Sequence, residues 1–509
     1  MKTLTTEDAF FLYIETPDQH QHTITTLIID PAQAPADFSI ERLVEKLEQD
    51  IHIRPQFCQR LVNTPFSMTP PVLVDDPYFA FKNHVHQIAA PAPGGMRQLT
   101  SIVEDIAGVR LSRRRPLWDC WFVSGLEQGR IAIIFKAHHC LADAISGMAF
   151  LGELFDIAPE AFAGRSQQSL SAGADMPNLW AIVYRAILSQ WRYQPRYHEV
   201  VGRTFRSLQR RRSLISQSHE LRQWVPAILE EAPRLKFNAP ITPHRSCAMG
   251  SVPLDDIRAI RQALDMTIND VITAACTLAL REYLIATDDL PDRPLICYMP
   301  VSLALKGRSS RNPEQSNHVG NMAVRLPVQI EDPAELAQAV KAATGAAKQV
   351  FDASFENLFQ GYLSMLPPYL ADWTLKQALS RQVVKYAPTN CNLVISNFPG
   401  PTMPLYLSGA HLAAVHCMGP TISGQGPNIT FMSYADQIHF SILACREHMP
   451  DLWQLADGVT RGFDALRALA GVAAEAAPAE ETAEPAVPRR QAADRPARPR
   501  IVVRDVITV

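Results

Sequence analysis

The sequence lacks the patterns that mark several classes of protein. Its 509 residues include nine cysteines, but no pair has C-x-x-C spacing and no cysteine–histidine group has the spacing of a zinc site. A scattered, odd set of cysteines is typical of a reducing compartment rather than of a disulfide framework. We therefore expect neither a disulfide scaffold nor a bound metal ion.

Long apolar runs and an excess of basic charge are also missing. No stretch approaches the roughly 20 apolar residues of a membrane-spanning helix, and the apolar start of the chain is interrupted by Glu7, Asp8 and Glu15. The net charge is 48 − 51 = −3, whereas domains that bind nucleic acid are usually strongly basic. These absences predict a cytoplasmic or peripheral protein without a nucleic-acid partner.

The first half of the chain alternates strand-like and helix-like segments. The β-branched segment 22–30 predicts a strand, and the apolar spacing in 38–51 predicts a helix. Residues 117–126 and 130–139 flank Glu-Gln-Gly, which predicts two strands joined by a turn. A helix is expected to begin at Asp143.

A second alternating half begins at Phe237. A long helix is predicted over 267–287, another from Pro333 to about residue 351, and a hairpin over 434–444 with Asp436 in its turn. We predict an α/β protein with an N-terminal lobe, a helical connector, a C-terminal lobe and a disordered tail rich in Ala, Pro, Glu and Arg, with boundaries at 1–178, 179–236, 237–472 and 473–509.

The connector is locally basic. Eight arginines lie between positions 185 and 212, against the single acid Glu199, and aromatic residues are interleaved at its start. Such a helical surface could contact anionic lipid headgroups over 180–212. The alternative, which the sequence favours equally, is a solvated helix that bridges two lobes.

Residues 136–147, Lys-Ala-His-His-Cys-Leu-Ala-Asp-Ala-Ile-Ser-Gly, form the principal candidate site. A neutral imidazole can accept and return a proton near pH 7, and a substrate can reach the end of a strand. Asp143 follows His139 by four residues and would orient the imidazole or fix the loop by pairing with an arginine. The alternative is a buried histidine followed by a helix that Asp143 caps, and the motif alone favours that ordinary structure.

Six segments, in order, resemble the bacterial wax ester synthase/diacylglycerol acyltransferase family. Residues 138–144 are similar to its HHxxxDG signature, with Ala144 in place of the glycine, and Arg115-Pro116-Leu117-Trp118 precedes them. The other matches are LTTEDAFFLYIETP, FNAPITPHR, TINDVITAA, VGN at 319–321 and SNFPGP at 396–401. Together they cover residues 3 to about 470. Alanine resists the positive φ that glycine allows, so Ala144 puts the loop geometry in question.

The resemblance implies two chloramphenicol acetyltransferase-like lobes with a substrate tunnel between them. It implies acyl-CoA as a substrate rather than a cofactor, no metal, and a fatty alcohol or diacylglycerol as acceptor, giving wax ester or triacylglycerol. It also implies a peripheral position at membranes or lipid droplets.

The resemblance also assigns roles to residues. His139 would be the general base, Asp143 would hold its loop, and His138 would support the tunnel wall with a lesser catalytic role open to it. Asn269 would donate to the oxyanion or simply cap its helix. Pro116, Leu117 and Trp118 would shape an acyl pocket or the lobe packing. Cys140 is not part of the signature, so a covalent mechanism through its thiol is not favoured.

Two other functions stay open at this stage. One is acyl transfer from a carrier-protein thioester to a polyketide-type alcohol, which the match across both lobes disfavours. The other is a catalytically weak lipid-binding protein of the same fold, which only Ala144 suggests.

Overall fold

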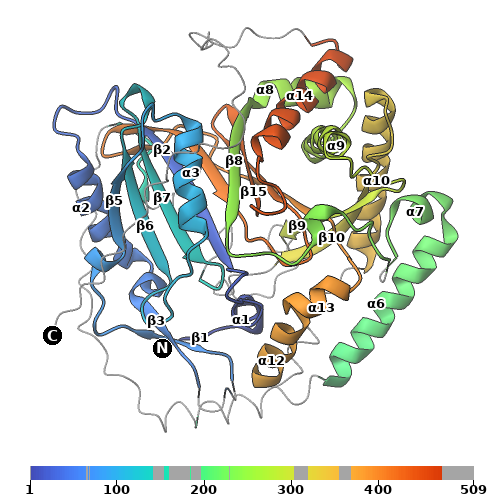
Figure 1. The fold of residues 1–509 in the computed structure, drawn as a ribbon, viewed down its shortest axis with the longest axis horizontal. Coiled ribbons are helices and arrows are strands. Elements are labelled where there is room, and N and C mark those ends of the chain that lie inside the picture. Colours follow the sequence, from blue (N-terminus) through green and yellow to red (C-terminus); the bar gives the residue numbers. More distant parts are fainter. Residues whose placement is uncertain are drawn as a thin grey trace, which may run out of the picture. The chain divides into compact units, whose positions relative to one another are not determined.

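A computed structural model describes residues 2–64, 67, 69–141, 154–159, 184, 197–227, 230–302, 319–354 and 368–472 (Figure 1). The predicted tail at 473–509 lies outside the described residues. So do Asp143, Ala144 and nearly all of the helix that was expected to begin at Asp143.

The first large sheet consists mainly of strands from the N-terminal half. Its strand order is β12 (Tyr406–Leu407), β13 (Ala410–Met418), β2 (His22–Asp30), β7 (Ile131–His138), β6 (Trp118–Ser124) and β5 (Val85–Ala89). Neighbours are antiparallel except for β5 and β6. The predicted strand at 22–30 and the predicted strand pair around Glu-Gln-Gly are confirmed.

Strand β13 belongs to the first sheet although it lies in the second half of the sequence. It pairs with β2, with His411 opposite Asp30 and Met418 opposite Ile24. The two halves of the chain are therefore joined within one sheet, a connection that the sequence analysis did not anticipate.

The second large sheet is formed entirely by the second half. Its order is β10 (Val319–Leu326), β9 (Leu295–Ser302), β11 (Leu393–Pro399), β14 (Asn428–Tyr434), β15 (Gln437–Cys445) and β8 (Arg245–Pro253). Strands β9, β11 and β14 are parallel, and the other pairs are antiparallel. Tyr434 pairs with Gln437, which confirms the predicted hairpin with Asp436 in its turn. A small sheet orders β1 (Lys2–Thr3), β4 (Val72–Asp75) and β3 (Gln59–Val62).

Helices cover both large sheets (Figure 1). In chain order they are α1 (Thr6–Tyr13), α2 (Ile40–Asp50), α3 (Met96–Ala107), α6 (Tyr197–Gln217), α7 (His219–Trp224), α8 (Leu254–Ala263), α9 (Ile268–Ala286), α10 (Pro333–Ser354), α12 (Pro368–Ala378), α13 (Arg381–Tyr386) and α14 (Trp453–Leu469). Helices α2, α9 and α10 confirm the helices predicted from apolar spacing.

Apolar burial holds the second sheet to its helices. Leu280 of α9, Phe431 of β14 and Phe463 of α14 belong to one buried cluster. Helices α9 and α14 approach so closely that a Cβ at Gly462 would lie 2.5 Å from the carbonyl oxygen of Ala275. Any side chain at this position would push the two helices apart.

Polar contacts also connect the two lobes. The backbone N–H of Ser423 donates to Oε1 of Gln19 over 2.7 Å, and Nη2 of Arg245 donates to the carbonyl of Asp18 over 2.8 Å. These contacts fix the loop between α1 and β2, which leads directly into the candidate site.

Among the described residues, no single helix has the length and apolar character to cross a membrane. Helices α8 and α9 would reach that length only together, and they meet at a bend of 98°. Most of α9 is buried inside the protein, as in the core helix of a globular domain.

Candidate active site

The histidine pair lies where strand β7 ends. His138 is the last residue of the strand and is paired with His22 of β2. The backbone N–H of His139 donates to the carbonyl of Gln21 over 2.8 Å, which continues the contact with β2 by one residue. Since successive side chains of a strand point to opposite faces, the two imidazoles diverge.

His138 points into the protein and is 1% exposed. The backbone N–H of Cys140 donates to its Nδ1 over 3.2 Å. Because a backbone N–H can only donate, the proton of the neutral imidazole lies on Nε2. That nitrogen is 3.7 Å from Oε1 of Glu15. Burial lowers the pKa of His138 to about 3, so its ring is neutral at pH 7.

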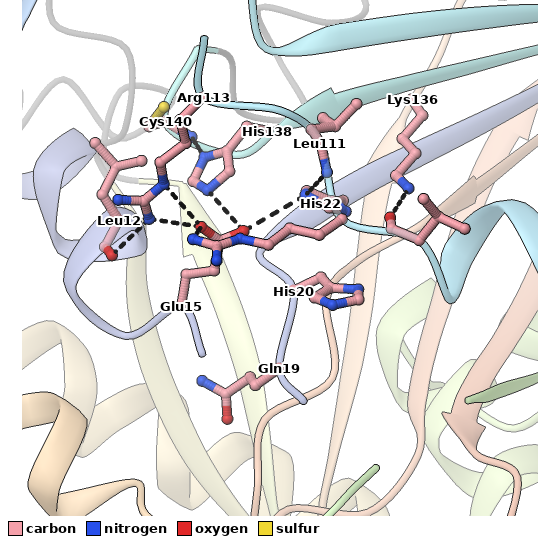
Figure 2. Close-up of polar contacts among 12 residues, drawn as sticks. Leu12, Glu15, Gln19, His20, His22, Leu111, Arg113, Lys136, His138 and Cys140 are labelled. Carbon is pink, nitrogen blue, oxygen red and sulfur yellow. Dashed lines mark hydrogen bonds and ion pairs between the residues drawn. The ribbon is translucent and has the colours of Figure 1, made fainter. Parts of the chain in front are cut away.

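Glu15 is the centre of the polar network behind the site (Figure 2). Its carboxylate accepts hydrogen bonds from Nη2 of Arg110 over 2.8 Å and from Nε and Nη2 of Arg113 over 3.1 and 2.5 Å. Nε2 of His22 lies 3.6 Å from Oε1. Burial opposes ionisation, but His22, His138 and the two guanidinium groups together lower the pKa of Glu15 far below its usual range. A permanent buried carboxylate therefore faces two neutral histidines.

His139 has a different environment from its neighbour. The residue is only partly buried, although its Nδ1 atom is buried, and its ring stacks on Phe11 of α1 with the centroids 3.9 Å apart and the planes 14° apart. The contact is made through the face of the ring. It therefore fixes the orientation of the imidazole plane without using the proton or lone pair of a ring nitrogen. Of the two adjacent histidines, His139 is thus the more exposed one.

Cys140 is an unfavourable nucleophile. It is buried, and burial raises the pKa of its thiol well above the usual value. The thiol is therefore protonated at neutral pH, in agreement with the expectation that a covalent mechanism through Cys140 is not favoured.

The Pro-Leu-Trp segment lies beneath the histidine pair. The carbonyl of Leu117 accepts the backbone N–H of His138 over 3.0 Å. Nε1 of Trp118 donates to the carbonyl of Phe57 over 2.7 Å. Pro116, Leu117 and Trp118 are all buried. These contacts support β7 from the neighbouring strand, and substrate binding by the segment stays a prediction.

Asn269 does not cap helix α9, so that alternative is wrong. The cap is Thr267, whose hydroxyl accepts the N–H of Asp270 while Asp270 accepts the N–H of Thr267. Asn269 is exposed, and its Oδ1 accepts from Nδ2 of Asn397 over 2.6 Å. An amide whose oxygen is engaged presents its NH2 group as a donor. Its predicted role toward an oxyanion stays a prediction.

The residues that surround the histidine pair were not predicted from the sequence. Phe11 and Glu15 come from the N-terminal segment, where Glu15 was noted only as an interruption of an apolar stretch. Arg110 and Arg113 come from the loop after α3. The available signal was an acidic residue directly after the apolar run 9–14, which calls for a buried partner if the segment packs inside.

Solved structures first define the class of fold. The chain matches a trichothecene 15-O-acetyltransferase from Fusarium sporotrichioides with a TM-score of 0.57 at 13% identity, covering 92% of this chain and 95% of that one. It matches the first condensation domain of the calcium-dependent antibiotic synthetase with a TM-score of 0.55 at 15% identity, covering 92% and 96%. The architecture is that of the two-lobed, chloramphenicol acetyltransferase-like acyltransferases.

Closer matches define the family. The wax ester synthase/diacylglycerol acyltransferase from Marinobacter aquaeolei VT8 matches with a TM-score of 0.67 and 26% identity over 93% of this chain and 100% of that one. A Mycobacterium tuberculosis (strain CDC 1551) protein whose assigned name is that of a diacylglycerol O-acyltransferase is 31% identical over 90% of this chain and 88% of its own length.

The family models agree with these relatives. The wax ester synthase/diacylglycerol acyltransferase catalytic domain matches residues 4–272, and the C-terminal domain of the same family matches 315–467. The chain belongs to the wax ester synthase/diacylglycerol acyltransferase family, as its motifs indicated. This membership supports O-acyl transfer from acyl-CoA.

Proposed function

We propose that the protein transfers the acyl group of a long-chain acyl-CoA to a fatty alcohol or a diacylglycerol, giving wax ester or triacylglycerol. The observation that carries this proposal is the difference between the two histidines. His138 is neutral, buried and held from two sides, whereas His139 is partly exposed and oriented by Phe11. The two reactants are acyl-CoA and the acceptor, so the proposed reaction needs no cofactor.

The chemistry is a direct transfer in which His139 moves one proton. Its neutral imidazole accepts the proton of the acceptor hydroxyl as that oxygen attacks the thioester carbonyl. The carbon–sulfur bond then breaks, and the imidazolium returns the proton to the departing CoA thiolate. The two substrates would reach His139 from opposite mouths of a tunnel between the lobes.

Other residues would position these groups. His138 anchors the strand end, because its Nδ1 accepts the N–H of Cys140 and its Nε2 faces Glu15. Asp143 would hold the loop after Cys140. The NH2 group of Asn269 is our candidate donor to the oxyanion.

The basic connector offers a contact with anionic membranes or lipid droplets over 180–212. Within α6, Arg206, Arg210 and Arg212 are exposed. Arg211 is not equivalent to them, because its Nη2 donates to the carbonyl of Pro226 over 2.7 Å. A test of the basic surface should therefore leave Arg211 in place.

Thiol release from palmitoyl-CoA tests the enzymatic proposal, with hexadecanol or dipalmitoylglycerol as acceptor. We expect turnover with at least one acceptor, and a fall of about 10²–10⁴-fold in His139→Ala. His219→Ala is the matched control, since His219 is exposed on α7 and lies outside the site. Turnover that survives His139→Ala would exclude the general base.

Two results would favour the other functions. Tight acyl-chain binding without turnover would indicate a lipid-binding protein. Turnover only from an acyl carrier-protein thioester would indicate a transferase for carrier-bound acyl groups.

A further inference from the structure

Exposed aromatic side chains gather on two short neighbouring helices. The described residues expose fourteen large hydrophobic side chains, and four of these fall between positions 369 and 386. They are Tyr369 (55% exposed) and Trp373 (60%) on α12, and Val383 (45%) and Tyr386 (78%) on α13. We call these four residues the α12–α13 face. Single exposed apolar residues are ordinary, but a cluster of them marks a surface that contacts a protein, a membrane or a ligand.

Helical spacing groups the members of this face within each of the two neighbouring helices. Tyr369 and Trp373 are four residues apart on α12, and Val383 and Tyr386 are three apart on α13, so each pair projects from one side of its helix. The opposite sides are anchored in the protein by Ala371 and Val384, which are buried. The face is therefore held outward by a fixed support.

The anchored side of α12 contacts the helix that orients the catalytic candidate. Helix α12 packs on α1, and Ala371 shares a buried cluster with Leu12 and Tyr13 (Figure 1). Burial raises the pKa of Tyr13, and the carboxylate of Asp372 adds to that effect. Since Phe11 of α1 stacks on His139, only one helix separates the α12–α13 face from the candidate site.

The segment that carries the aromatic rings has a positive net charge. Residues 368–386 contain three basic side chains and one acid, Asp372, which Lys376 neutralises over 2.7 Å. Lys385 is exposed, and its Nζ lies 5.5 Å from the ring centroid of Tyr386. Trp and Tyr prefer the boundary between water and acyl chains, and lysines beside them favour anionic headgroups.

We propose that the α12–α13 face docks the protein on a lipid surface that carries anionic headgroups, beside the helix α1 that carries Phe11. This inference rests on the proposed function only in that the acceptor is dissolved in the lipid. A second copy of the chain would be a different occupant, but the polar hydroxyl and indole N–H groups and the surrounding positive charge suit a membrane boundary better than a dry protein interface.

Vesicle flotation tests the docking with the full chain. The variant Tyr369→Ser/Trp373→Ser/Tyr386→Ser removes the rings without touching the buried anchors. With vesicles of phosphatidylcholine and phosphatidylglycerol, we expect about a tenfold or larger loss of the bound fraction. Tyr78→Ser is the matched control, because Tyr78 is 81% exposed and lies outside the face. It should float as the unchanged protein does.

Activity separates failure of this inference from failure of the proposed function. Turnover of dipalmitoylglycerol in vesicles should fall with flotation in the triple variant, while turnover of hexanoyl-CoA with dissolved hexanol should not. If the unchanged protein turns over neither pair, the proposed function fails, whatever the flotation shows.

Three results would overturn the docking surface itself. One is equal flotation of the triple variant and the unchanged protein. Another is equal flotation on vesicles that contain phosphatidylcholine alone. The third is an unchanged protein that sediments as a dimer and a triple variant that sediments as a monomer, with the same flotation, which would make the face an interface between copies.

Discussion

The two large sheets have six strands each, but the surroundings of their central strands differ. Near the end of β7 in the first sheet, the buried side chains include Glu15, His22, Lys136 and His138. The cluster that joins the second sheet to α9 and α14 consists of apolar residues. The first environment holds charges that are costly to bury, and the second supplies favourable burial.

Lys136 illustrates this cost. It lies two residues before His138 on β7 and is 1% exposed. Its Nζ donates to the carbonyls of Ile106 and Val109. Burial lowers its pKa to about 7, although Asp119 and Glu15 act in the opposite direction. A sheet that stabilised only its own fold would gain more from an apolar residue here. We infer that the first sheet keeps these charges for the site.

Of the variants that test this comparison, Glu15→Gln should lose the most unfolding free energy. The change removes the carboxylate that two arginines and two histidines face, and breaking a buried charge network typically costs about 3–5 kcal/mol of unfolding free energy. Urea unfolding measures the loss. In the second lobe, Glu282→Gln removes a carboxylate that is half exposed and bound to Arg461, so about 1 kcal/mol or less is expected. Equal losses in the two variants would contradict the special position of Glu15.

Leu280→Ala tests the apolar core of the second sheet. Leu280 is fully buried between α9 and its neighbours, so the lost packing and the cavity should cost about 3 kcal/mol. Urea unfolding and thiol release, both at a temperature where the variant is folded, measure the two effects. We expect lower stability with an unchanged turnover number. A turnover number that falls in the fully folded variant would show that the second core also shapes the site.

His138→Asn should give the smallest effect, and it concerns pH. The pKa of His138 is about 3 in the folded protein and about 6.5 in an unfolded chain. Below pH 6.5 the unfolded chain therefore binds the proton first, so stability is complete above pH 6.5 and declines as the pH falls toward 3. Asparagine keeps an oxygen that can accept the N–H of Cys140 but cannot titrate.

The thermal unfolding midpoint, measured between pH 6.5 and 4, should therefore decline less steeply in His138→Asn. It should not become flat, because burial also lowers the pKa of His22 and His439. Leu280→Ala should shift the whole curve without changing its slope. Identical slopes in His138→Asn and the unchanged protein would contradict the assignment of a neutral, buried His138.

Local patterns in the sequence predicted the local structure well. Strand β2, the pair β6 and β7, helix α9 and the hairpin of β14 and β15 all follow from apolar spacing and turn residues. The family follows from ordered motifs, because each motif keeps its residue types and its place in the chain.

Local sequence patterns did not predict the contacts between distant segments of the chain. Strand β13 pairs with a partner almost 400 residues earlier in the chain, and no local pattern identifies that partner, so the pairing of β13 with β2 was missed. Glu15 interrupts an apolar stretch, which suggests exposure until Arg110 and Arg113 are placed beside it. Capping of α9 by Asn269 was one alternative, because Thr, Asn and Asp are all common at helix N-termini. The sequence alone does not show which of Thr267, Asn269 and Asp270 is the cap.

The pairing of β13 with β2 also has a consequence during synthesis, because β2 is made long before its partner strand. Asp30 leaves the ribosome about 380 residues before its partner His411. At about 5–20 residues per second, β2 waits roughly 20–80 s for the strand that covers its outer edge. During that interval the row of free N–H and C=O groups along β2 can pair with another nascent chain. Slow synthesis or crowded expression should therefore favour aggregation through β2 before the second half of the chain is complete.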